Sequence, residues 1–328
     1  MAIILTVFDS FGELLGLLIM NESTCSLADF AHYNRDNARF PERSLLHRSI
    51  ANSFILATAT LGNSVILAAL RTCPTLHPPS KALLYSLVLS DLGVGVLVIP
   101  LKLALNLAVI LRNPSLYCLL WRPFRIIAAV MGTVSFFTST AIAIDRYLAF
   151  RLQVRYRLMI TLWKVILLLI AYWILAIIWA CTEILNETLN RVLGTVAILS
   201  CVVITLVCYQ RIYKGLRRQA ALIQVQCQPT TNQNSSSSFS VGEYKRTVGN
   251  MVWVYCCLLV CYVPYYLNLI LLIAFDSRAL VLAKNVTSIV IYSNSSLNPV
   301  IYCWKIKEIR KESLAIYHSI CHPCKDNR

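Results

Sequence analysis

Long apolar runs separated by short polar stretches dominate the pattern of the chain. Seven of these runs reach the roughly 20 residues that an α-helix needs to cross the hydrocarbon core of a bilayer. They are continuous rather than alternating, which excludes the strands of a transmembrane barrel, and lipid offers the backbone no third way to satisfy its hydrogen bonds. The pattern therefore predicts seven transmembrane helices, at about residues 49–71, 82–108, 119–147, 160–183, 192–215, 248–274 and 281–303.

Two flanking segments border this predicted seven-helix domain, which spans 49–303. Residues 1–48 are predicted to be an extracellular N-terminal segment. Within it, 2–19 are either a weak signal sequence or an upstream extension, because no Lys or Arg precedes the apolar stretch. Residues 304–328 are predicted to be a cytoplasmic tail, in which isoleucines alternate with Lys and Arg. That alternation predicts a short amphipathic eighth helix on the inner leaflet.

Composition supports an all-α membrane protein. The chain is 58% hydrophobic and only 14% charged, and a soluble domain of 328 residues has too small a core to hide so many apolar side chains. A net charge of +15 would by itself favour nucleic-acid binding. The basic residues, however, fall in short clusters between apolar runs, so we expect membrane lipid and not nucleic acid as their partner.

Basic residues gather on one face of the predicted bundle, in the loops after the first, third and fifth runs and in the tail. The positive-inside rule makes this face cytoplasmic, which predicts a multi-pass plasma-membrane protein with an extracellular N-terminus and a cytoplasmic C-terminus. Three glycosylation sequons fall on the opposite face, at Asn21, Asn186 and Asn285. Cys321 and Cys324 follow the amphipathic stretch and are candidates for palmitoylation.

Few polar side chains interrupt the apolar runs. Because such residues are costly in lipid, we expect them to face the interior of the bundle. Asp91 lies in the second run, Ser135 in the third, and Asn294 and Asn298 in the seventh. A lone carboxylate with hydroxyls and amides suits a hard cation, although hydrogen bonding between helices explains the same set equally well.

Five short motifs occur in order, each on a different predicted helix. Together they make the chain, over about residues 49–317, closely resemble the rhodopsin-like G-protein-coupled receptors. The resemblance implies a receptor, not an enzyme, that binds an extracellular ligand and activates a heterotrimeric G protein. A small membrane transporter or channel is the alternative, but the internal repeats typical of transporters are not visible. The motifs are Gly62-Asn63, Leu87 to Asp91, Asp145-Arg146-Tyr147, Pro264 in Cys261-Tyr262-Val263-Pro264, and Asn298-Pro299-Val300-Ile301-Tyr302.

The resemblance also implies roles for individual residues. Four of them match a sodium pocket, which implies an allosteric sodium ion and no other cofactor: Asp91, Ser135, Asn294 and Asn298. Others match the activation switch and the G-protein-coupling region: Asp145, Arg146, Tyr147, Tyr209, Tyr262, Pro264, Asn298, Pro299 and Tyr302.

Several positions depart from the family pattern. The toggle tryptophan is replaced by Tyr262, and the fifth-helix proline by Cys201. The glutamate that often pairs with the arginine of the triplet would fall at Tyr244, so we predict basal activity. A short loop between helices four and five, without the fifth-helix proline, is similar to the melanocortin, endothelial-differentiation lysophospholipid, cannabinoid and adenosine receptors.

The disulfide of the family is also altered. Its third-helix cysteine would lie at Trp121, and Cys118 precedes that position by close to one helical turn. The resemblance implies a bridge from Cys118 to Cys181, with Cys25 as the other candidate partner.

The predicted ligand pocket lacks two familiar groups. Ala128 stands where amine receptors carry an aspartate, and Tyr292 where opsins carry their retinal-binding lysine. Lys102, Arg122 and Arg125 instead favour an anionic small molecule, lipid or peptide, unless they only extend toward lipid headgroups or water. The predicted ligand-binding residues are Lys102, Arg125, Ala128, Tyr262 and Tyr292.

Overall fold

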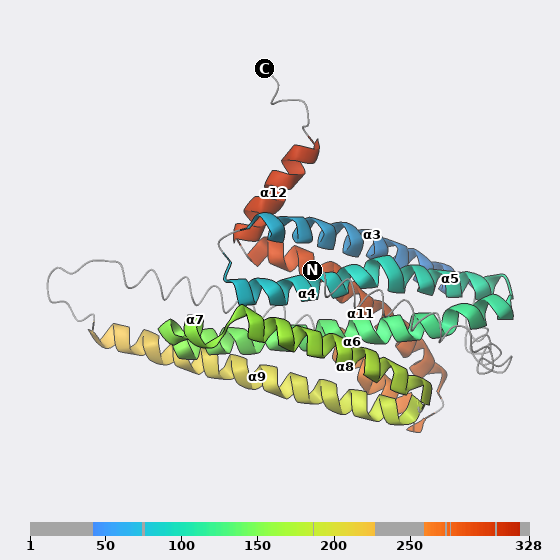
Figure 1. Cartoon of the computed structure of the whole chain (residues 1–328). Coiled ribbons are helices and arrows are strands. Elements are labelled where there is room, and N and C mark those ends of the chain that lie inside the picture. The colour runs from blue at the N-terminus through green and yellow to red at the C-terminus, as the bar shows by residue number, and fades with distance from the viewer. Residues whose placement is uncertain are drawn as a thin grey trace, which may run out of the picture.

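The structure is a computed structural model, and its described parts are residues 42–73, 76–185, 187–226, 259–272, 274–275, 277–305 and 307–321. The regular elements in these parts are helices, and no strand occurs among them. Figure 1 shows the long helices packed side by side in an elongated bundle. The all-α class predicted from the apolar pattern is confirmed.

Each predicted run overlaps a helix, but the helices extend beyond the apolar residues. The part of the sixth run before residue 259, and most of the N-terminal segment, lie outside the described residues. The helices are α3 (Glu42–Thr72), α4 (Pro78–Gly93), η2 (Val94–Val98), α5 (Ile99–Ile110), α6 (Pro114–Leu152), η3 (Gln153–Arg155), α7 (Tyr156–Met159), α8 (Leu162–Leu185), α9 (Glu187–Gln226), Leu259–Leu272, α11 (Arg278–Lys305) and α12 (Lys307–Cys321).

Five helical stretches of the described chain are long and apolar enough to cross a membrane: Ser44–Thr72, Pro78–Ile110, Pro114–Met159, Leu162–Thr182 and Val192–Gly215. Leu259–Leu272 is a shorter apolar helix, and its preceding residues are not described. The seventh predicted run forms α11, which carries the polar residues of that run into the bundle.

The second apolar run contains a π-helical turn that its sequence pattern does not predict. Pro100 is the second residue of α5; it has no backbone N–H, and in a regular α-helix its ring would crowd the carbonyl of Val96. The π turn at Val94–Val98 accommodates this conflict. Because such a turn contains an extra residue, it changes the direction in which all later side chains of this helix point, including Lys102.

Close contact between α3 and α11 depends on a glycine. A Cβ built at Gly62 would lie 3.0 Å from both Cβ and Cγ of Pro299. One residue later, Asn63 Nδ2 donates to the backbone oxygen of Ser295 at 2.9 Å, across the same pair of helices. The Gly62-Asn63 pair thus aligns α11 against α3 and determines where the polar residues of α11 lie.

The amphipathic eighth helix is present as α12. Figure 1 shows it turning away from the end of the bundle near α3. Its Ile309 is fully buried in an apolar cluster with Ile66, Leu70 and Tyr302. This contact attaches α12 to the bundle by its apolar face.

Candidate functional site

Asp91 is fully buried at the point where α4, α6 and α11 meet. Asn298 Nδ2 donates to its Oδ2 at 2.7 Å, and Ser295 Oγ donates to its Oδ1 at 2.9 Å. Ser135 Oγ on α6 donates to Oδ1 at 3.4 Å. A buried carboxylate is costly unless it is hydrogen-bonded, so these donors stabilise it and join three helices at one point.

The fourth residue predicted for this pocket, Asn294, is not among the donors to Asp91. Its side chain is buried, but within the described ranges its Oδ1 has no hydrogen-bond partner, as is also true of Asn63 Oδ1. In the described parts of the chain, no basic side chain forms an ion pair with Asp91. A buried carboxylate surrounded by hydroxyl and amide groups has the oxygen donors that a hard monovalent cation such as sodium takes.

Ser295 is a member of this cluster that the motif reading missed. It lies three residues before Asn298 in α11, and residues with that spacing share a helix face. The three-residue spacing from Asn298 is the sequence signal that could have identified Ser295.

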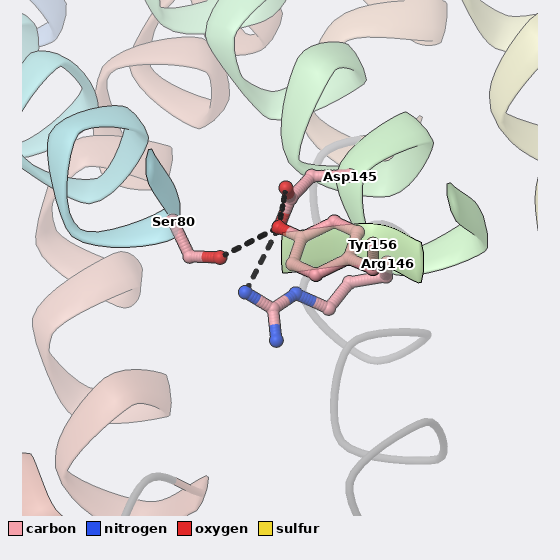
Figure 2. A network of polar contacts seen from close by, with 4 residues as sticks. All are labelled: Ser80, Asp145, Arg146 and Tyr156. Atoms are coloured by element: carbon pink, nitrogen blue, oxygen red, sulfur yellow. Dashed lines mark hydrogen bonds and ion pairs between the residues drawn. The ribbon is translucent and has the colours of Figure 1, made fainter. Parts of the chain in front are cut away.

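A second polar network surrounds Asp145 near the end of α6 (Figure 2). Ser80 Oγ, at the start of α4, donates to Asp145 Oδ2 at 2.8 Å, and the Tyr156 hydroxyl donates to Oδ1 at 2.5 Å. The two hydroxyls lie 3.4 Å apart. Arg146 Nη2 lies 3.0 Å from Asp145 Oδ2 and completes the set. The three carboxylate contacts thus come from the start of α4, from α6 itself and from the loop that follows α6.

Tyr156 reaches Asp145 because the chain reverses direction after α6. Gln153 ends the helix with φ 44°, a left-handed conformation that non-glycine residues rarely adopt. The short η3 turn follows, and α7 begins at Tyr156. The Tyr156 ring also lies 5.1 Å from the ring of His77, between centroids. Neither Tyr156 nor Ser80 was predicted, because no local pattern places a loop tyrosine against a helix.

Arg146 is only partly sequestered by this network. Its side chain is 28% exposed, whereas that of Asp145 is 4% exposed. The Nε atom of Arg146 is buried and has no hydrogen-bond partner among the described residues. The guanidinium is therefore held through Asp145 while part of it faces outward.

The other predicted switch residues divide between two clusters. Tyr147 and Tyr209 pack against the fully buried Ile212, whereas Tyr302 belongs to the cluster that holds α12. The Tyr302 hydroxyl is buried, and no group in the described part of the chain bonds to it. The structure therefore brings Tyr209 near the arginine triplet and packs the Tyr302 ring against the apolar cluster that holds α12.

Tyr262 packs deep in the bundle, at a ring-centroid distance of 5.1 Å from Phe136 of α6. Cys201, at the position of the missing proline, contacts the same cluster. Pro264 lies two residues later on the exposed face of helix Leu259–Leu272.

At the opposite end of α6 from Asp145, aromatic rings pack against basic side chains. The rings of Tyr117 and Trp121 stack at 5.5 Å, and Phe124 lies 6.1 Å from Trp121, between centroids. Lys102 Nζ lies 5.3 Å from the centroid of Phe124, and Arg125 Cζ lies 5.4 Å from that of Trp121. Cation–π attraction at these distances orients both cations on the ring faces.

The remaining predicted ligand residues lie in two different places. Ala128 and Tyr292 pack against the apolar cluster that contains Phe124 and Tyr117. Tyr262 belongs to the separate cluster around Phe136. The structure thus brings Lys102, Arg125, Ala128 and Tyr292 around one cluster and leaves Tyr262 outside it.

The predicted bridge between Cys118 and Cys181 is wrong. Cys118 is disulfide-bonded, but Cys181 is a free thiol. The pairing could not be predicted from the family pattern, because Trp121 occupies the position at which the family has its third-helix cysteine. The other candidate partner, Cys25, lies outside the described residues.

Most of the predicted modification sites also lie outside the described part of the chain. Asn21, Asn186 and Cys324 are not described, nor is the side chain of Cys321. Asn285 is partly exposed in α11, two turns after its start. These sites stay predictions.

Comparison with known proteins identifies the class. The family model described as "7 transmembrane receptor (rhodopsin family)" matches residues 62–202 and 181–302. The chain therefore belongs to the rhodopsin family of seven-transmembrane receptors, which are not enzymes. It is a multi-pass membrane receptor, and nothing in the comparisons supports the transporter alternative.

Individual relatives are receptors of two kinds. The chain is 25% identical over 295 residues to the adenosine receptor A3 of Ovis aries, covering 81% of this chain and 89% of that receptor. It is 23% identical over 299 residues to the histamine H2 receptor of Rattus norvegicus, covering 82% and 79%. The crystal structure of squid rhodopsin matches with a TM-score of 0.70 at 15% identity, covering 88% of this chain and 89% of that one, which shows a shared fold.

Proposed function

We propose that this receptor binds an extracellular ligand and activates a heterotrimeric G protein at the end of the bundle where Asp145 and Arg146 lie. The main support is that Arg146 is partly exposed and lies beside Asp145, a carboxylate that already accepts hydrogen bonds from two hydroxyls. Because Asp145 does not depend on Arg146 alone, releasing the guanidinium leaves the buried carboxylate still hydrogen-bonded to two hydroxyls. Arg146 is thus free to exchange its partner for a group on a G protein.

The proposed orientation places this end of the bundle in the cytoplasm. The positive-inside rule supports it, since the described basic residues Arg151, Arg155 and Arg157 follow Arg146 at the same end. The start of α3 and the cluster of Lys102, Arg125 and the aromatic rings then face the extracellular side.

The proposed ligand is anionic and has an apolar part. Lys102 and Arg125 provide positive charge beside a cluster of aromatic rings, a combination suited to a carboxylate or phosphate attached to a hydrophobic body. An amine is disfavoured, since Ala128 provides no acid to pair with it. The chemistry therefore differs from that implied by the name of the histamine relative.

The function is tested by measuring guanine-nucleotide exchange in a panel of G-protein subtypes, using cells that express the full chain. We expect unstimulated exchange above that of mock-transfected cells, and loss of it in Arg146→Ala. Arg151→Ala is the matched control, because Arg151 is an exposed cation in the last turn of the same helix. Exchange equal to mock with every subtype and every ligand would exclude the proposal.

The ligand class is tested in the same assay with a library of anionic lipids, carboxylates and acidic peptides. Lys102→Ala and Arg125→Ala should each weaken the response to an active member by about 10-fold or more, as expected for the loss of a charge-assisted hydrogen bond. Arg112→Ala, an exposed cation in the loop between α5 and α6, should leave it unchanged. Equal responses of all three variants would contradict an anionic ligand at this cluster.

A further inference from the structure

Gly215 lies in the interior of α9, at a position where a glycine weakens the helix. Glycine loses more backbone freedom on folding than any other residue and is a poor helix former. Its backbone here is right-handed, as it is for the other glycines in the described part of the chain, so no positive φ requires it. The physical reason for a glycine at this position is therefore a close packing contact.

Phe150, near the end of α6, occupies the space that a side chain at position 215 would take. A Cβ built at Gly215 would overlap Cζ and Cε1 of the Phe150 ring. The same ring packs against Ile212, which is fully buried one turn earlier in α9. The ring therefore cannot give way without losing its place against Ile212, and it interlocks the two helices at this end of the bundle.

The interlock lies among exposed cations. Phe150 follows Arg146 by four residues in α6, so the two side chains share a helix face. Arg211 precedes Gly215 by four residues and Arg218 follows it by three, which places both on the face of α9 that meets α6. Both arginines of α9 are exposed, and the Arg146 side chain is 28% exposed.

The sequence supplies no acid to neutralise these cations locally. No Asp or Glu occurs in α9 after Glu187, and none occurs in α6 after Asp145, which already accepts from two hydroxyls. Guanidinium groups bind carboxylates through paired hydrogen bonds, and a surface of one sign attracts a partner of the other. The face around the interlock thus fits an acidic segment of a protein partner.

We propose that Phe150 and Gly215 are positioning residues, whose interlock sets the spacing at which Arg146, Arg211 and Arg218 bind an acidic segment of the G protein. The proposal rests on the receptor function proposed above, and it names the surface and the chemistry of the partner at that site. A methyl group at position 215 pushes α9 away from α6. The arginines on the two helices then no longer match one acidic segment.

The interlock is tested with a double-mutant cycle on the full-length receptor in lipid nanodiscs. Gly215→Ala alone should lower the melting temperature by about 2–4 °C, because the new methyl group overpacks against the ring. Phe150→Leu removes the Cε and Cζ atoms and keeps an apolar side chain against Ile212. In that background Gly215→Ala should raise the melting temperature or leave it unchanged, because alanine favours the helix and meets no ring.

Nucleotide exchange with purified G protein tests the positioning role. Gly215→Ala should raise the half-saturating concentration of G protein by about 3- to 10-fold, and adding Phe150→Leu should restore it. A merely structural loss of folded receptor lowers the maximal rate and leaves this concentration unchanged. Gly194→Ala is the control on the same helix, because its Cβ meets only Trp179 Cζ2, at an ordinary distance of 3.4 Å.

Two neighbouring cations test the chemistry of the partner. Arg218→Ala should raise the half-saturating concentration by about 10-fold, as expected for the loss of one charge-assisted hydrogen bond. Arg217 is also exposed, but it points about 200° away from Gly215 around the helix. Arg217→Ala should therefore leave the concentration at the wild-type value.

The outcomes distinguish this proposal from the receptor function on which it rests. An equal fall in melting temperature for Gly215→Ala with and without Phe150→Leu would overturn the interlock. Equal effects of Arg217→Ala and Arg218→Ala would overturn the acidic partner at this face. If wild type activates no G protein, the receptor function fails, and the melting temperatures still decide whether Phe150 and Gly215 interlock.

Discussion

Asp145 is a buried carboxylate that is stabilised by several partners. Two hydroxyls, from Ser80 and Tyr156, donate to its two oxygens, and Arg146 adds an ion pair (Figure 2). Hydrogen bonds to a buried charge contribute more to stability than those between neutral groups, because the alternative is an unpaired ion in a low-dielectric environment. Tyr156 is therefore a structural partner of the triplet, although it lies in the following loop.

Removing the Tyr156 hydroxyl should destabilise the receptor. In Tyr156→Phe, Asp145 Oδ1 loses its nearest donor, and we expect a loss of about 1.5–3 kcal/mol in the free energy of unfolding. Thermal denaturation of the full-length receptor in nanodiscs measures the change. Tyr213→Phe is the control, because Tyr213 is exposed on α9. A melting temperature for Tyr156→Phe equal to that of Tyr213→Phe would show that the bond contributes nothing.

At the scale of the elements, two short sequences decide how neighbouring helices fit together. The π turn before Pro100 changes the direction of the end of the second helix that carries Lys102. Gly62 lets α3 and α11 pack closely, because it has no Cβ to collide with the Pro299 ring. Both features act on backbone spacing and direction, and both determine where polar side chains meet.

The contact at Gly62 is testable with a matched pair of glycine variants. In Gly62→Ala the new Cβ lies 3.0 Å from two ring atoms of Pro299, which cannot rotate away, so we expect an overpacking cost of about 1–3 kcal/mol. A Cβ at Gly132 meets nothing within 4 Å, so Gly132→Ala should stabilise its helix by up to about 1 kcal/mol. Melting temperatures that shift in the same direction for both would contradict the close approach.

For the molecule as a whole, α6 passes through every proposed site. Arg125 lies beside the aromatic cluster, Ser135 bonds to Asp91 in the middle of the bundle, and Asp145 and Arg146 lie near the end. The middle site joins α4, α6 and α11, so a cation bound there would stabilise the packing of three helices. Such binding adds to stability by mass action, and the gain grows with the logarithm of the ratio of ion concentration to dissociation constant.

The proposed sodium site predicts an ion-specific melting temperature. Wild-type receptor should have a higher melting temperature in sodium chloride than in choline chloride of equal ionic strength. The bound ion should add about 2.7 kcal/mol to the free energy of unfolding at a sodium concentration 100 times the dissociation constant. Asp91→Asn should lose this increment. Ser90→Ala should keep it, because Ser90 is buried next to Asp91 but bonds only within its own helix, to the Leu87 carbonyl. If Asp91→Asn still melted at a higher temperature in sodium chloride than in choline chloride, sodium would be acting at another site.

Apolar length and a few motifs in order were sufficient to predict the class of the receptor and the positions of its helices, because lipid leaves a spanning backbone almost no alternative to a helix. The same cost of polarity in lipid predicted that Asp91, Ser135 and Asn298 face inward, and they meet in the structure. Which side chains bond to them was decided only by the tertiary structure. Neighbouring residues on a helix point about 100° apart, so the rotation of α11 selects Ser295 and not Asn294 as a donor to Asp91. The path of a loop brings Tyr156 to Asp145, and no periodic pattern along the chain encodes such a path.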